Sequence, residues 1–126
     1  MLASQFTRNI KPAVDQELSA YKAAQAAGKT DAAFTHLERA HILGQESTSL
    51  HVKVHCLMLI WAIKNANTSQ WNAGEIAGQL FRIVGAATKT ALGLVPIGNT
   101  GGANISPFKK LPLDADTAEL IAAAKR

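Results

Sequence analysis

Five side chains that can bind a transition metal fall on the inward faces of three predicted helices when residues are placed at intervals of about 100°. They are Glu17, Glu38, His41, His51 and His55. Carboxylates and imidazoles are unfavourable to bury unless they pair, form hydrogen bonds or coordinate a metal ion. The set therefore predicts a metal-binding site inside a helical bundle. His36 lies on the same predicted helix as His41, but it points away and is not part of the set.

The spacing of these residues brings two pairs together. Glu38 and His41 are three residues apart, and His51 and His55 are four apart. These two separations place side chains next to each other on one helix, so each pair can chelate one ion. The Glu-x-x-His pair is also half of the signature of di-iron carboxylate bundles, but the chain contains no second Glu-x-x-His. We therefore do not expect a ferritin-like di-iron protein.

The identity of the metal and its chemistry stay open at this point. Three imidazoles with up to two carboxylates suit Zn, Fe, Mn, Ni or Cu. With the three histidines and Glu38 as ligands, Glu17 is a candidate general base, or a further ligand of a site with two ions. An open coordination position would indicate a metal-dependent hydrolase or oxidase acting on a small molecule. Ligands supplied entirely by the protein would indicate storage, sensing or a structural role.

A metal-free alternative explains the same residues. A buried Glu/His hydrogen-bond network can fix the register of packed helices without a metal ion. Residues 33–45 also look like part of a tetratricopeptide helix pair. At least three such units are normally needed to bury a solenoid core, so this reading predicts a small interaction module, and a homo-oligomer is compatible with it.

Helix-breaking residues predict an all-α fold. Four main helices are expected over residues 5–27, from a cap at Thr30 or Asp31 to residue 43, from the polar lead-in at 47–49 to residue 64, and over 70–92. A short final helix is expected at 116–124, and no segment alternates with the period of a strand. Together these elements predict a compact bundle of four main helices.

A glycine-rich segment at residues 98–108 ends in apolar anchors, which favours an ordered loop folded over one end of the bundle. Asn99, Thr100 and Asn104 would line the site if this loop covers the ligands. The segment matches neither a P-loop nor a dinucleotide-binding fingerprint, so phosphate binding is not expected.

Composition restricts the remaining classes of protein. With 126 residues and 48% hydrophobic content, residues 1–126 are expected to form one domain. The one cysteine excludes an internal disulfide and a thiolate zinc site. The net charge of +4 comes from scattered basic residues, which disfavours nucleic-acid binding. No signal peptide or membrane-spanning run is evident, so we expect a soluble, cytoplasmic protein.

Three blocks of sequence resemble an uncharacterised bacterial family. The blocks are residues 33–45, residues 51–55, and residues 82–93 together with 98–104. The family is catalogued as domain of unknown function 3703. The resemblance covers nearly the whole chain, and it implies a bacterial source and a single short domain. It implies no activity.

Overall fold

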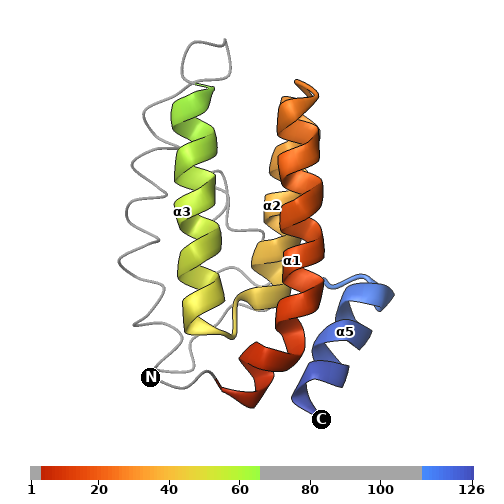
Figure 1. The fold of residues 1–126 in the computed structure, drawn as a ribbon. Coiled ribbons are helices and arrows are strands. Elements are labelled where there is room, and N and C mark those ends of the chain that lie inside the picture. The colour runs from red at the N-terminus through yellow and green to blue at the C-terminus, as the bar shows by residue number, and fades with distance from the viewer. Residues whose placement is uncertain (1–3, 66–111) are drawn as a thin grey trace.

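Four helices make up the part of the protein that the computed structural model describes, residues 4–65 and 112–126. They are α1 (Gln5–Ala26), α2 (Thr30–Gly44), α3 (Thr48–Lys64) and α5 (Ala115–Lys125) (Figure 1). No strand occurs within these two ranges, and the predicted all-α class is confirmed. The expected helix at residues 70–92 and the expected loop at residues 98–108 lie outside the described residues.

The helices α1 and α2 form an antiparallel hairpin (Figure 1). The hydroxyl of Ser4 accepts a hydrogen bond from the backbone N–H of Thr7 at 3.0 Å, which caps the start of α1. The chain reverses at Gly28, whose φ of 76° lies in the left-handed region that favours glycine. Burial raises the pKa of the Tyr21 hydroxyl, which lies near the end of the apolar stripe of α1.

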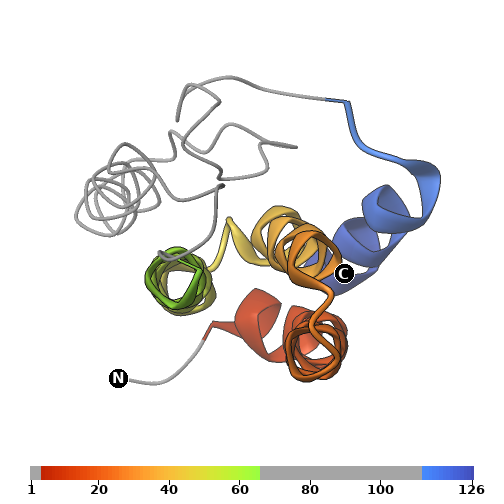
Figure 2. The same ribbon diagram turned by 90° about the horizontal axis from the view of Figure 1, so that it is seen from above.

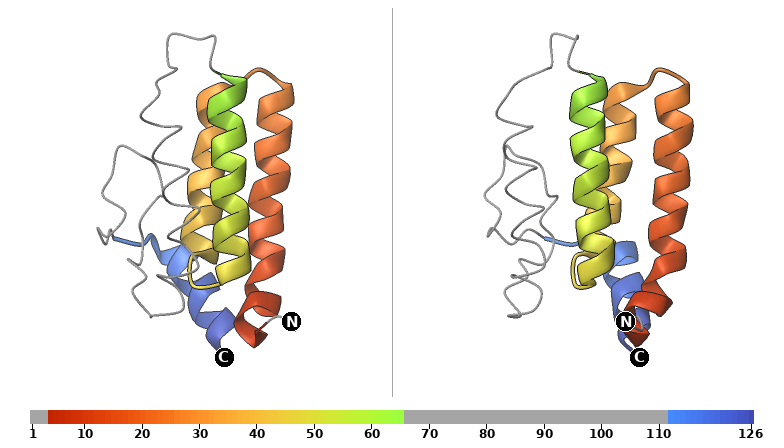
Figure 3. Two further views of the ribbon diagram at one scale, coloured as in Figure 1. Left: turned by 90° about the vertical axis from the view of Figure 1, so that its left-hand side faces the viewer. Right: turned by 60° about the vertical axis from the view of Figure 1, so that its left-hand side comes forward.

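The helix α3 lies beside α2, on the side of the bundle away from α5 (Figure 2). Helices α1, α2 and α3 run alongside one another, and α5 packs near the N-terminal end of α1 (Figure 3). All four helices contribute to one hydrophobic core. Its buried members are Ile10, Val14, Leu18, Tyr21, Ala33, Leu37, Ala40, Leu43, Leu50, Val54, Met58, Ile121 and Ala124.

A three-residue turn, residues 45–47, connects α2 to α3 and brings their ends into close contact. A Cβ atom on Gly44 would lie 3.1 Å from the Cβ of Leu50 and 3.4 Å from a methyl group of Val14. The N–H of Ser47 donates to the carbonyl of Gly44 at 2.9 Å, and the N–H of His51 donates to the carbonyl of Ser47 at 2.8 Å. The turn therefore fixes how the last turn of α2 faces the first turn of α3.

The helix α5 is held at both of its ends. The Asp114 carboxylate accepts a hydrogen bond from the backbone N–H of Thr117 at 2.8 Å, and this bond lowers the pKa of Asp114. At the other end, the side-chain amide of Asn9 donates to the carbonyl of Ala124 at 3.0 Å. The second of these contacts ties the C-terminal end of α5 to the start of α1. Among the described helices, none is long and apolar enough to cross a membrane.

Candidate metal centre

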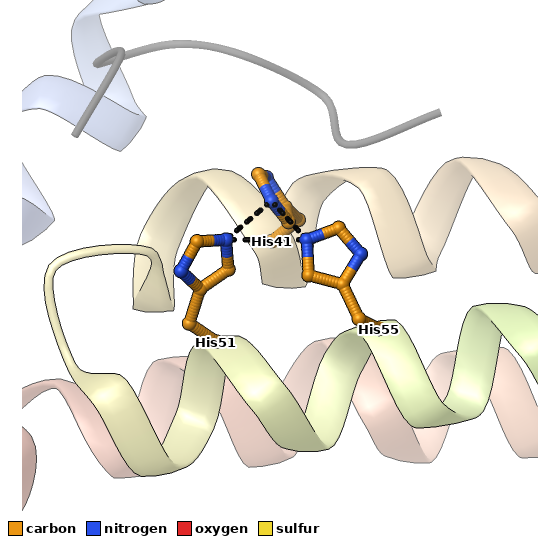
Figure 4. Close-up of side chains that lie close together, drawn as sticks. All are labelled: His41, His51 and His55. Atoms are coloured by element: carbon orange, nitrogen blue, oxygen red, sulfur yellow. Dashed lines mark hydrogen bonds between the residues drawn. The ribbon is translucent and has the colours of Figure 1, made fainter. Parts of the chain in front are cut away.

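Three imidazoles meet between α2 and α3, with their Nε2 atoms directed at one another (Figure 4). His41 comes from the last turn of α2, and His51 and His55 come from successive turns of α3. The Nε2 of His41 lies 3.0 Å from that of His51 and 3.1 Å from that of His55, and the remaining pair is separated by 3.2 Å. The three nitrogens thus form a nearly equilateral triangle.

The imidazoles are almost completely withdrawn from solvent. Their relative exposures are 3% for His41 and 1% each for His51 and His55. The ring of His41 stands nearly perpendicular to the other two, with interplanar angles of 72° and 73°. The rings therefore meet through their nitrogen atoms rather than through stacked faces.

Protons alone cannot satisfy all three nitrogen contacts. A hydrogen bond between two Nε2 atoms requires one that carries a proton and one that offers a lone pair. Because each atom is in one of these two states, at least two of the three share the same state. Their contact then opposes two lone pairs or two N–H groups at 3.0–3.2 Å, which is unfavourable in a buried site.

A metal ion would satisfy all three nitrogens at once. Each nitrogen lies about 1.8 Å from the centre of the triangle, which is shorter than the bond of about 2.0–2.1 Å that zinc forms with imidazole nitrogen. A single ion can therefore reach all three atoms with ordinary bond lengths. His41, His51 and His55 form the group of potential ligands that the structure brings together in the described ranges.

The chain also matches a known family model. The model is described as "Protein of unknown function (DUF3703)", and it matches residues 8–121. The chain belongs to this family. The matched range includes all of α2 and α3, and therefore the three imidazoles. No curated protein and no solved structure matches the chain.

Glu17 of this DUF3703 protein has other partners in the structure. One oxygen of its carboxylate lies 2.8 Å from the Nδ1 of His36, and the other lies 3.2 Å from the Nε of Arg39. Glu17 therefore links α1 to the outer side of α2, and it is not in the group formed by the three imidazoles. The helical projection of the sequence placed His36 away from the inward-facing set. In the structure this half-buried histidine contacts Glu17 and lies outside the triangle.

The other predicted site residues are placed as follows. Glu38 is half-buried on α2, one turn before His41, and it is not in the group of potential ligands. Asn99, Thr100 and Asn104 lie outside the described residues. In this DUF3703 protein the structure thus brings together the three predicted histidines and neither of the two predicted carboxylates.

Proposed function

We propose that this protein binds a transition-metal ion through the Nε2 atoms of His41, His51 and His55. The observation that carries the proposal is the buried nitrogen triangle, with sides of 3.0, 3.1 and 3.2 Å. Imidazole nitrogens converge in this way when they share a cation, because the cation gives every lone pair a partner. We further propose that residues 1–126 form one domain built around this site.

The metal-free alternative accounts for fewer of the contacts. A hydrogen-bond network explains at most two sides of the nitrogen triangle and leaves the third side unfavourable. A Glu/His contact does occur in the bundle, between Glu17 and the Nδ1 atom of His36. It involves none of the three nitrogen atoms of the triangle. We therefore place the metal-binding function ahead of an interaction module.

The donor set restricts the class of metal. Three neutral imidazoles favour Zn, Cu, Fe or Ni, whereas Mg and Ca prefer sites built from oxygen ligands. Mn binds best where carboxylate oxygens contribute, and the group of potential ligands contains none within the described ranges. Zinc is the first metal to test, because the distances between the nitrogens suit its bond lengths.

Metal analysis of protein purified without a polyhistidine tag tests this function directly. We expect close to one ion per chain in the wild-type protein and a large loss of metal in His41→Ala, His51→Ala and His55→Ala. The chain has four histidines, so His36→Ala is a matched control that removes the one imidazole outside the triangle. It should retain its metal. Wild-type protein that neither contains metal nor takes it up after dialysis against zinc would refute the proposal.

A further inference from the structure

We propose that the metal centre leaves one side of its coordination sphere to a small anionic ligand. This inference rests on the proposed function, since it describes what else an ion held by the three imidazoles would bind. It adds a further ligand, a monodentate anion, to the three imidazole nitrogens.

The size of the triangle determines where such an ion can sit. For sides of 3.0, 3.1 and 3.2 Å and bonds of about 2.0–2.1 Å, an ion bound to all three nitrogens would lie about 1.0 Å out of their plane. A planar three-coordinate ion with the same bonds would need nitrogens about 3.5 Å apart. The triangle is too small for that arrangement, so it forms a cap on one side of the ion.

The cap leaves the opposite side of the ion without a ligand from the triangle. The angles between nitrogens, measured at the ion, would be about 91–106°, which lies between octahedral and tetrahedral values. Both geometries require at least one more ligand on the far side. Zinc in particular is four-coordinate in most protein sites, and three protein ligands with one exchangeable position are the arrangement of its catalytic sites.

Charge favours an anion in the remaining position. Imidazoles bind metals in their neutral form, so the three histidines leave both positive charges of a divalent ion uncompensated. The site is buried, with exposures of 1–3% for the three side chains, and an uncompensated charge is unfavourable there. The Glu17 carboxylate is paired with His36 and Arg39 and does not belong to the ligand group.

Cobalt substitution tests this inference. Untagged wild-type protein is freed of metal and loaded with Co²⁺, whose visible absorption depends on the number and type of its ligands. Azide is then added while bound cobalt is measured after gel filtration. We expect a change in the visible spectrum that saturates with azide concentration while the cobalt stays bound. Perchlorate at the same ionic strength, a weakly coordinating anion, should leave the spectrum unchanged.

Two variants make the result specific to the triangle. His36→Ala should reproduce the azide response of the wild type, and His41→Ala should lose it. A cobalt spectrum that does not respond to azide, even after long incubation at high concentration, would overturn the inference and leave the metal-binding function intact, because it would mean that the bound ion does not accept an added anion. Failure of the wild-type protein to bind cobalt, zinc or any other transition metal would instead refute the proposed function.

Discussion

The nitrogen triangle predicts that the effect of replacing His51 on stability depends on bound metal. Leucine has a volume close to that of histidine, so His51→Leu removes the Nε2 atom of His51 from the triangle with little change in side-chain volume. In the wild-type protein without metal, one of the three contacts is unfavourable. In the variant, the Nε2 atoms of His41 and His55, 3.1 Å apart, can share one proton in a satisfied hydrogen bond. The relief is on the order of 1–3 kcal/mol, the usual penalty for an unsatisfied buried polar group.

With metal present, the same substitution should be destabilising, because the loss of metal binding outweighs this relief. An ion that binds only the folded state stabilises it by about 4 kcal/mol when its free concentration is about a thousand times its dissociation constant. Loss of one of three ligands removes most of this stabilisation. The change in the free energy of unfolding caused by His51→Leu should therefore differ by about 4 kcal/mol between zinc-loaded and chelated protein. Other contacts of His51 are present in both conditions and cancel in this difference.

Urea unfolding of untagged wild-type and His51→Leu protein, with buffered zinc and with EDTA, measures this difference. His36→Leu is the matched control, because it makes the same chemical change outside the triangle. Its effect on the free energy of unfolding should be the same in the two conditions. If His51→Leu lowers that free energy equally with zinc and with EDTA, the assignment of the triangle as a metal site is wrong.

Three further predictions concern the surrounding structure. Glu17→Gln should lower the free energy of unfolding by about 1 kcal/mol, since it weakens a partly exposed ion pair with Arg39, and metal content should be unchanged; a parallel loss of metal would show that Glu17 is a ligand. Gly44→Ala places a methyl group 3.1 Å from the Cβ of Leu50, so it should lower the free energy of unfolding by about 1–3 kcal/mol and reduce zinc affinity in an equilibrium titration. The pKa of Asp114 is lowered by its capping hydrogen bond, so the stability lost in Asp114→Ala should be constant above the usual aspartate pKa of about 4 and should shrink as the pH falls below it. Thermal unfolding across this pH range checks the last prediction, and a loss that grows toward low pH would contradict it.

The helices were predictable because their ends carry local signals. Gly28 follows the first helix, and its positive φ is the conformation that ends a helix and reverses the chain. The predicted segment at residues 5–27 became Gln5–Ala26, and the second helix extends to Gly44 rather than ending before it. Gly44 also packs closely against Leu50 of α3, a contact that the pattern of either segment alone does not give.

The three histidines were predictable for two different reasons. His51 and His55 share a face because they are four residues apart on one helix. His41 lies on another helix, and the projection established only that it faces inward. Its meeting with the other two depends on the short turn at residues 45–47, which places the end of α2 opposite the start of α3.

Glu17 shows where helical projection fails. The projection gives the angle of a residue around its helix, but it gives neither the height along the bundle nor the reach of a long side chain. Glu17 borders the apolar stripe of α1, and its carboxylate extends sideways to His36 and Arg39. A usable signal was present, because an antiparallel hairpin that reverses near Gly28 brings residues at equal distances from the turn, such as 17 and 39, to similar heights.

All three imidazoles lie within one helical hairpin, and the outermost two are 14 positions apart in the chain. An ion held by them would close a short loop, which carries a small entropic penalty compared with contacts between distant segments. Its binding energy would therefore be available as soon as α2 and α3 pair, before the contact of α1 with α5 that joins the two ends of the chain. Metal uptake would then be coupled to the pairing of α2 with α3, so the supply of metal would set how much of this hairpin is folded.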